Sequence, residues 1–418
     1  MSNNYIKRLL EDDIQANSKA FPVLLICGPR QVGKTTILEK IIKEKKQDIK
    51  YVTLDDPIQR VLAKTDPATF IEKYGTPLII DEIQYATELL PYIKISVDKK
   101  RMEDKSNSYG MYYLTGSQMF VMMQNVSESL AGRVGIIDMY GLSNAEITGY
   151  TQKSFIPTYE ECRKKEDNTK LDINELFERI LKGSYPEIYQ NSEISSEKFY
   201  NSYLRTYIER DIRDMISIKD EIKFLTFMSA VAARTAQELN YNDIAKDVDI
   251  DIKTVQKWIS ILKTSGIVYL LQPYYNNLIK KIIKRPKLYF TDTGFACYLA
   301  GYSDAKTLQI SAYNGAIFEN YVVMEIVKSY VNDNKDSRLY LNYYRDTTGK
   351  EIDLLIIKDG TVYPIEIKKT GNPNKEMIKN FNVLENLGLE IGEGGIVCTI
   401  DKIVPIDSKN NYIPIQCI

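Results

Sequence analysis

The 418-residue sequence contains no histidine. This absence excludes serine and cysteine triads that need an imidazole, zinc sites with histidine ligands, and histidine general bases. Only five cysteines are present, and none has the paired short spacing of a zinc finger or a disulfide scaffold: Cys27, Cys162, Cys297, Cys398 and Cys417. Chemistry in this chain must therefore use carboxylates, lysine, arginine, hydroxyls and backbone groups, a set that suits magnesium and phosphate.

The sequence also lacks a charge imbalance and a long apolar run. Lys and Arg number 55 and Asp and Glu 56, a net charge of −1. This balance argues against a nucleic-acid coat protein held by charge alone, although it allows a local basic patch. No apolar run approaches the ~20 residues of a membrane span, and the opening MSNNYIKRLLEDD has no apolar signal-peptide core. We expect a cytoplasmic protein with no membrane partner.

Length predicts two or three domains, at roughly 150 residues per domain, and 44% hydrophobic residues can fill their cores. In the first 150 residues, short apolar runs alternate with segments of helical periodicity, which predicts an α/β fold with a parallel sheet covered on both faces. The expected strands are Pro22–Cys27, Tyr51–Leu54, Pro77–Ile80, Met111–Leu114 and Gly135–Met139.

A phosphate-binding loop follows the first of these strands. Residues 28–35 match GxxxxGK[ST], and they stand between a buried strand and a helix, as the motif requires. The alternative is a glycine-containing turn before an ordinary helix. We expect backbone amides to surround the phosphates, Lys34 to reach the β- and γ-phosphates, and the Thr35 hydroxyl to bind Mg²⁺. The predicted nucleotide-binding residues in this segment are Gly28, Pro29, Arg30, Gln31, Val32, Gly33, Lys34, Thr35 and Thr36.

An acidic pair ends another predicted strand, in PLIIDE. The carboxyl ends of parallel strands meet at one edge of the sheet, so Asp81 is expected to hold Mg²⁺ and Glu82 to polarise the attacking water. An acidic pair at a strand end is also ordinary surface decoration, and the upstream loop favours the functional interpretation.

Further candidates follow the last two predicted strands of this region. Thr115, Ser117 and Gln118 in MYYLTGSQ are predicted γ-phosphate sensors, with a polar turn as the alternative. Arg133 in SESLAGR is a candidate arginine finger, acting in its own chain or across a subunit boundary, with a surface arginine as the alternative.

Taken together, GPRQVGKTT, YVTLDDP, PLIIDEIQ, LTGSQ, SESLAGR and TYIERDI resemble a family of bacterial and archaeal AAA-type P-loop ATPases that carry a C-terminal domain of uncharacterised function. The resemblance covers nearly the whole chain. It implies an AAA-type P-loop NTPase domain over residues 1–150, ATP binding and ATP hydrolysis, but no known substrate.

The middle of the chain is predicted to be a helical connector over residues 151–225, followed by a winged-helix-like domain over 226–285. In the latter, a short helix, a turn at Asp249–Asp251 and a longer helix precede an apolar strand. Exposed positions of the longer helix are expected to reach DNA phosphates or base edges: Lys253, Thr254, Gln256, Lys257 and Ser260. A basic patch is predicted beside them: Lys280, Lys281, Lys284, Arg285 and Lys287. A protein–protein module is the alternative, and the acidic DVDIDI would repel a DNA backbone.

The last segment, residues 286–418, carries a carboxylate constellation. Asp353 is expected on one strand of a hairpin and Glu366 and Lys368 on the next, with a turn at 358–360 and Glu319 on a preceding helix. The pattern resembles the PD-(D/E)xK restriction-endonuclease-like superfamily. That resemblance implies a Mg²⁺ held by Asp353, Glu366 and the Ile367 carbonyl, with Glu319 completing the cluster and Lys368 positioning or deprotonating water. A solvent-facing hairpin, or a nuclease fold without activity, are the alternatives.

The favoured hypothesis is a Mg²⁺-ATP-dependent ATPase whose nucleotide state controls a DNA-binding module and a nuclease-like domain. One rival is a nucleotide-switched regulatory or scaffold protein without nuclease activity. Another is an ATPase that remodels protein partners. Self-association is compatible with each.

Overall fold

The computed structural model describes residues 5–45, 49–105, 108–117, 129–166, 171–207, 221–274 and 285–418. The chain forms two compact units. The first comprises Met1–Leu142, Thr264–Gly266 and Val331–Asn334, and the second comprises Ser143–Lys263, Ile267–Tyr330 and Lys335–Ile418. None of the helices in the described part of the chain combines the length and apolar character that a membrane span requires.

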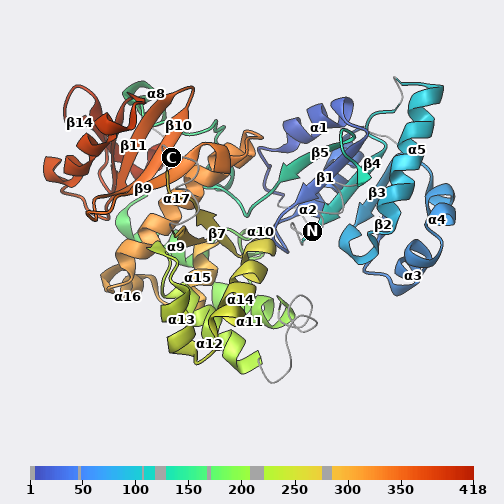
Figure 1. Ribbon diagram of the computed structural model, residues 1–418, viewed down its shortest axis with the longest axis horizontal. Coiled ribbons are helices and arrows are strands. Elements are labelled where there is room, and N and C mark those ends of the chain that lie inside the picture. Colours follow the sequence, from blue (N-terminus) through green and yellow to red (C-terminus); the bar gives the residue numbers. More distant parts are fainter. Residues whose placement is uncertain are drawn as a thin grey trace. The chain divides into compact units, whose positions relative to one another are not determined.

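The first unit is built on a five-stranded parallel sheet of order β2-β3-β4-β1-β5 (Figure 1). All five predicted strands are confirmed to within two residues at each end. The elements of this unit are α1 (Glu11–Ala20), β1 (Val23–Cys27), α2 (Lys34–Lys45), β2 (Lys50–Thr53), α3 (Pro57–Thr65), α4 (Pro67–Tyr74), β3 (Leu78–Asp81), the 3-10 helix η1 (Ile83–Ala86), α5 (Leu89–Glu103), β4 (Tyr112–Gly116) and β5 (Val134–Asp138).

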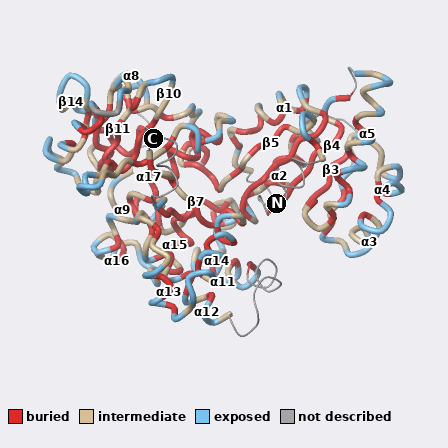
Figure 2. The backbone as a smooth tube through the Cα atoms, viewed as in Figure 1, coloured by how far each residue is buried: buried red, intermediate tan, exposed pale blue. Residues whose placement is uncertain are grey.

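Burial explains why these strands are central. Every residue of β1, β3 and β4 is buried, as expected for strands covered on both faces, and Figure 2 shows their backbone within the buried part of the unit. The core beneath β1 and β3 includes Leu25, Ile80 and Leu114. Local chemistry also sets the helix boundaries: Asp56 caps α3 through the amide of Ile58, and Pro57 occupies the first helical position.

The second unit contains helices and two sheets. Its elements are α7 (Asn144–Thr148), α8 (Tyr159–Lys165), α9 (Ile173–Lys182), α10 (Pro186–Gln190), α11 (Ser196–Tyr207), α12 (Glu221–Ala232), β6 (Gln237–Glu238), α13 (Tyr241–Val248), α14 (Ile252–Thr264), β7 (Val268–Leu271), β8 (Lys287–Phe290), α15 (Thr293–Leu299), α16 (Ala305–Ile310), α17 (Asn314–Asn332), η5 (Ser337–Leu339), β9 (Leu341–Arg345), β10 (Glu351–Lys358), β11 (Thr361–Ile367), η6 (Lys375–Leu387), β12 (Glu390–Ile391), β13 (Gly394–Cys398), β14 (Val404–Pro405), β15 (Asn410–Pro414) and η7 (Ile415–Cys417).

Strand β8 closes a small antiparallel sheet of order β6-β8-β7. Between β6 and β7 the chain forms α13 and α14, which are separated by a turn in which Asp249 is left-handed (φ 56°). The boundary expected between residues 285 and 286 therefore falls inside one sheet, because β8 pairs with strands on the other side of it.

The larger sheet is mixed and has the order β14-β15-β13-β11-β10-β9, with β12 pairing with β11. Strands β10 and β11 form the predicted hairpin. The turn residues Asp359 and Gly360 have φ values of 51° and 80°, the conformation that the tightest hairpin turns require. The register pairs Leu354 with Ile365. Continuing it by one step brings Asp353 opposite Glu366, so both predicted acidic residues lie at the same level of the hairpin.

Candidate functional site

The phosphate loop connects β1 to α2, and its shape depends on glycine. Gly28 has a φ of 156°, and a Cβ added there would lie 1.9 Å from the backbone oxygen of Met139. No side chain fits that approach. Gly33 also has a positive φ, 94°, immediately before α2 begins at Lys34. The loop therefore ends with the amino end of a helix directed at its interior, the arrangement that binds phosphate groups.

Lys34 lies folded across this loop. Its ammonium donates hydrogen bonds to the carbonyl oxygens of Gly28 (2.9 Å) and Pro29 (2.7 Å), and the residue is buried. Burial lowers the pKa of Lys34, and the nearby carboxylate of Glu82 opposes that effect. The amine thus reaches the concave side of the loop, where a phosphate would accept the same hydrogen bonds.

Asp81 connects the end of β3 to the phosphate loop. Its Oδ1 atom accepts a hydrogen bond of 3.0 Å from Thr35 Oγ1 and a second from Thr115 Oγ1, and its Oδ2 accepts one of 2.9 Å from Tyr51 OH. The predicted Mg²⁺ fits this donor set, because a threonine hydroxyl and a carboxylate oxygen are hard ligands already side by side. Thr35 and Asp81 are the residues that would hold the ion.

Glu82 follows Asp81 in a left-handed backbone conformation, with φ 57° and ψ 47°. This conformation is uncommon for a residue with a side chain and is typical of functional sites. Its carboxylate lies 3.9 Å from the guanidinium of Arg30 and 3.5 Å from the hydroxyl of Ser117, and it accepts a hydrogen bond from Gln84. The structure thus brings the predicted residues Arg30, Lys34, Thr35, Asp81, Glu82 and Ser117 together, while Gln118 lies outside the described residues.

Arg133 requires a correction. It directly precedes β5, whose first residue pairs with Val23 at the start of β1, whereas the phosphate loop follows the other end of β1. At about 3.3 Å per residue, the strand separates Arg133 from the loop by roughly 15 Å. Its guanidinium instead forms a two-pronged ion pair with Asp98, at 2.7 and 3.0 Å. The prediction that Arg133 contacts the nucleotide of its own chain is therefore wrong. Action across a subunit boundary stays a prediction.

Two residues that support the loop escaped the sequence interpretation. Arg8 is buried, and its guanidinium donates to the carbonyl oxygens of Val32 and Tyr140, both at 2.8 Å. Tyr51 holds Asp81 as described above. An arginine or tyrosine outside the motif gives no local signal. Only the parallel pairing of β2 with β3, which places Thr53 beside Asp81, brings the Tyr51 strand to this edge.

The C-terminal cluster lies within the second unit and is also assembled. The ammonium of Lys368 lies 3.2 Å from Asp353 and 2.7 Å from Glu366, and the amide of Ile367 donates to Asp353 at 2.9 Å. Asp353, Glu366 and Lys368 therefore converge as predicted. One Glu366 oxygen, Oε2, is buried and has no hydrogen-bond partner in the protein.

Lys287 is the unexpected member of this cluster. Its ammonium contacts Glu319 (3.0 Å), Glu351 (2.6 Å) and Asp353 (3.5 Å), and the side chain is only 3% exposed. The basic patch predicted around this position is thus wrong for Lys287, because a buried ammonium cannot contact a DNA backbone. Lys280, Lys281 and Lys284 lie outside the described residues.

The predicted magnesium ligands Glu319, Asp353 and Glu366 do not fit a divalent ion as arranged. Lys287, a cation that the prediction did not include, stands among these carboxylates beside the predicted Lys368. The described residues contain no group of three or more His, Cys, Asp or Glu that could hold a metal. The expected site is therefore corrected to a mixed cluster of carboxylates and ammonium groups.

The charges in this cluster perturb one another. Burial and the charge of Asp353 raise the pKa of Glu319 to about 7 and that of Glu366 to about 8. Burial alone would raise the pKa of Asp353, but Lys287 and Lys368 lower it below its ordinary value. Burial would likewise lower the pKa of Lys287, yet Tyr289 and the surrounding carboxylates raise it. Lys287 is consequently a cation, not a free amine nucleophile.

Most of the α14 residues that were predicted to reach DNA are exposed. Lys253, Gln256, Lys257 and Ser260 are exposed, whereas Thr254 is half-buried and bonds to Asp251 at the start of the helix. The acidic residues that were expected to repel DNA are partly neutralised, since Asp247 pairs with Arg234 and Asp249 with Lys223.

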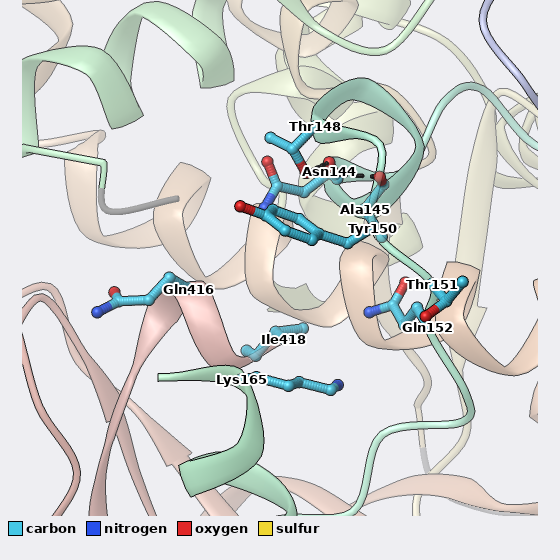
Figure 3. Close-up of a pocket in the computed structure, with 9 residues that line it drawn as sticks. All are labelled: Asn144, Ala145, Thr148, Tyr150, Thr151, Gln152, Lys165, Gln416 and Ile418. Atoms are coloured by element: carbon cyan, nitrogen blue, oxygen red, sulfur yellow. Dashed lines mark hydrogen bonds between the residues drawn. The ribbon is translucent and has the colours of Figure 1, made fainter. Parts of the chain in front are cut away.

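A further pocket in the second unit does not suit a nucleotide. Figure 3 shows the side chains of Gln152, Lys165 and Gln416 around it, and its volume of about 10 Å³ is that of roughly one water molecule.

The five cysteines, expected to be unpaired, are all free and buried.

Comparison with known proteins supports a P-loop ATPase domain in the first unit. Residues 20–148 match the family model of an AAA domain. This match supports an AAA-type ATPase domain in the first unit. Residues 173–306 and 314–418 match two models described as domains of unknown function, DUF8612 and DUF4143.

Similar proteins are distant. An uncharacterised protein of Mycobacterium tuberculosis is 24% identical over 84% of this chain and 71% of its own length. A Walker-type ATPase of Pyrococcus abyssi aligns over 71% of this chain and 97% of its own, with a TM-score of 0.44 and 13% identity. The RuvB Holliday junction branch migration motor of Thermotoga maritima aligns over 62% of this chain and 88% of its own, with a TM-score of 0.31 and 16% identity.

Proposed function

We propose that the chain is a Mg²⁺-dependent ATPase whose phosphate loop, Asp81 and Glu82 form one hydrolytic site. The observation that carries this proposal is the contact between Thr35 and Asp81, since it joins the loop that binds phosphate to the strand end that carries the acidic pair. The match of residues 20–148 to an AAA domain supports it.

In this proposal Lys34 leaves the carbonyl oxygens of Gly28 and Pro29 and donates to the β- and γ-phosphates instead. Thr35 and Asp81 would hold Mg²⁺, which would supply positive charge to the phosphate oxygens. Glu82 accepts the proton of the attacking water as that water adds to the γ-phosphorus and ADP leaves. Arg30, 3.9 Å from Glu82, orients this carboxylate.

The decisive experiment measures ATP turnover of the full chain beside K34A and E82Q. We expect both variants to lose hydrolysis, with E82Q retaining nucleotide. Hydrolysis by both at the parent rate would refute the site. Lys64 and Glu88 are exposed residues outside this constellation, so K64A and E88Q are matched controls.

A second candidate function is DNA binding by α14, favoured by the exposed Lys253 and Lys257 on one helix and by the paired Asp247 and Asp249. Its test is a salt titration of duplex-DNA binding. Each phosphate-contacting lysine contributes about 0.9 to the slope of log affinity against log salt, so K253Q/K257Q should lower the slope by about 1.8. K246Q, an exposed change on α13, is the control. Absence of any salt-dependent binding would favour the rival in which this module contacts protein.

For the C-terminal cluster we favour the alternative without nuclease activity. In that alternative, the bound nucleotide would control a C-terminal domain that serves as a binding platform and does not cleave DNA. The reason is that the buried ammonium of Lys287 already contacts Glu319, Glu351 and Asp353.

A further inference from the structure

The carboxylate cluster of the second unit is organised around an ammonium group. Lys287 lies on β8, Glu319 on α17, and Glu351 and Asp353 on β10, so one side chain links three elements that are distant in sequence. A lysine ammonium has three N–H donors. Here it has three carboxylate partners, at 3.0, 2.6 and 3.5 Å.

Because Lys287 is buried, its positive charge must be balanced by neighbouring carboxylates. Removing an ammonium ion from water costs several kcal/mol unless opposite charges surround it. Lys287 is 3% exposed, so its stability as a cation depends on the carboxylates around it. Those carboxylates in turn repel one another, and the ammonium offsets that repulsion, as a bound metal ion does at other acidic sites.

Three further oxygens of the cluster also have cationic partners. Arg345 contacts the second oxygen of Glu351 at 3.3 Å, and Lys368 contacts Asp353 and Glu366. Mg²⁺ demands near-ideal octahedral geometry at about 2.0–2.1 Å from its ligands, and it could enter only by displacing these donors. Glu366 Oε2 is buried and has no hydrogen-bond partner among the described residues.

We propose that Lys287 is a built-in cation that takes the place of a divalent metal ion among Glu319, Glu351 and Asp353. While Lys287 is present, the cluster binds no divalent cation tightly. Removal of its charge converts the same carboxylates into a site for a hard divalent ion of the Mg²⁺ or Mn²⁺ class. This inference does not depend on ATP hydrolysis, because every residue involved lies in the second unit.

The test is titration of Mn²⁺, followed by the electron paramagnetic resonance of the free ion, into the full chain without nucleotide. The variants are K287M, K287R, D353N and K287M/D353N, with K306M as a control at an exposed lysine. We expect K287M to bind Mn²⁺ at least about tenfold more tightly than the parent chain, a change of about 1.4 kcal/mol. D353N in the K287M background should abolish the gain, and K287R and K306M should behave like the parent.

The comparison of the parent chain with D353N decides the outcome even if K287M does not fold. Equal, weak Mn²⁺ binding by the two supports the proposal. Tight binding by the parent chain that D353N removes would overturn it, as would a folded K287M, judged by circular dichroism, that binds Mn²⁺ no better than the parent.

Discussion

Thr35 Oγ1 lies 3.0 Å from Asp81 Oδ1, although the two residues are 46 positions apart in the sequence. Thr35 lies in the first turn of α2 and Asp81 ends β3, and the parallel sheet brings the two to the same edge. Tyr51 holds the other oxygen of Asp81 at 2.9 Å. The carboxylate is therefore fixed in orientation before any nucleotide arrives, and the consequences can be tested by substitution.

Substitution of Lys34 by alanine should weaken ATP binding. The buried ammonium donates to two loop carbonyl oxygens and would donate to the phosphates instead. Loss of a charge-assisted contact of this kind costs at least about 1.4 kcal/mol, or tenfold in affinity. Binding of a fluorescent ATP analogue measures it, with K64A as the control. Unchanged affinity of K34A would place the nucleotide elsewhere.

Substitution of Glu82 by glutamine should separate binding from hydrolysis. The amide preserves shape but cannot accept the proton of water, so turnover should fall by about 10²–10⁴-fold while ATP affinity changes little. Steady-state phosphate release measures the first quantity and analogue titration the second. Equal turnover by E82Q and E88Q would show that Glu82 is not the base.

Substitution of Arg133 by alanine should leave ATP affinity unchanged, because its guanidinium pairs with Asp98 at the far end of β1 and β5. This partly exposed pair should contribute about 0.2–1 kcal/mol to the free energy of unfolding. D98A should therefore lower the melting temperature as R133A does, and the double variant should show no further loss. A tenfold loss of affinity in R133A would contradict the observed position.

Substitution of Glu366 by glutamine should change how stability depends on pH. Burial and Asp353 raise the pKa of Glu366 from an ordinary 4.5 to about 8. Between these values the folded chain holds a proton that the unfolded chain releases, so rising pH favours unfolding. The contribution is complete below 4.5 and lost above about 8.

E366Q carries no such proton. Its melting temperature should equal that of the parent near pH 4 and exceed it by a few degrees near pH 8. Thermal melts across this range measure the effect, and E376Q, a change at an exposed carboxylate, is the control. A difference that is constant with pH would show that Glu366 titrates normally.

Supercoiled DNA with Mg²⁺ or Mn²⁺ should not be nicked in a manner that depends on Asp353. Lys287 already contacts two carboxylates that metal-assisted cleavage would need, Glu319 and Asp353. Gel electrophoresis of the parent beside D353N measures this. Nicking by the parent that D353N abolishes would establish the nuclease hypothesis that we set aside.

The parts of the molecule that are specified by residues close together in the sequence could be predicted. The phosphate loop, the five strands of the first sheet and the Asp359–Gly360 turn each depend on residues adjacent in the sequence. The hairpin pattern even brought Asp353, Glu366 and Lys368 together correctly.

What failed depended on packing between distant segments. Lys287 was grouped with neighbouring lysines because they are close in sequence, but β8 places it against α17 and β10. Arg133 was assigned from its motif, although its partner Asp98 belongs to helix α5. Hydrophobic periodicity shows which face of a helix or strand is buried. It does not identify the oppositely charged side chain, on another helix or strand, that forms the ion pair.

The contacts of the Arg8 guanidinium determine how far the chain can be shortened from its N-terminal side without disturbing the phosphate loop. The AAA domain match begins at residue 20, and a fragment cut there would lose the side chain that bridges the Val32 and Tyr140 carbonyl oxygens. Without that contact, the buried carbonyl oxygen of Val32 loses a donor, which costs about 1–3 kcal/mol, and the partly buried carbonyl oxygen of Tyr140 loses one as well. A shortened fragment that fails to bind nucleotide would then show only that the Arg8 contact is missing. Its catalytic residues could all still be intact.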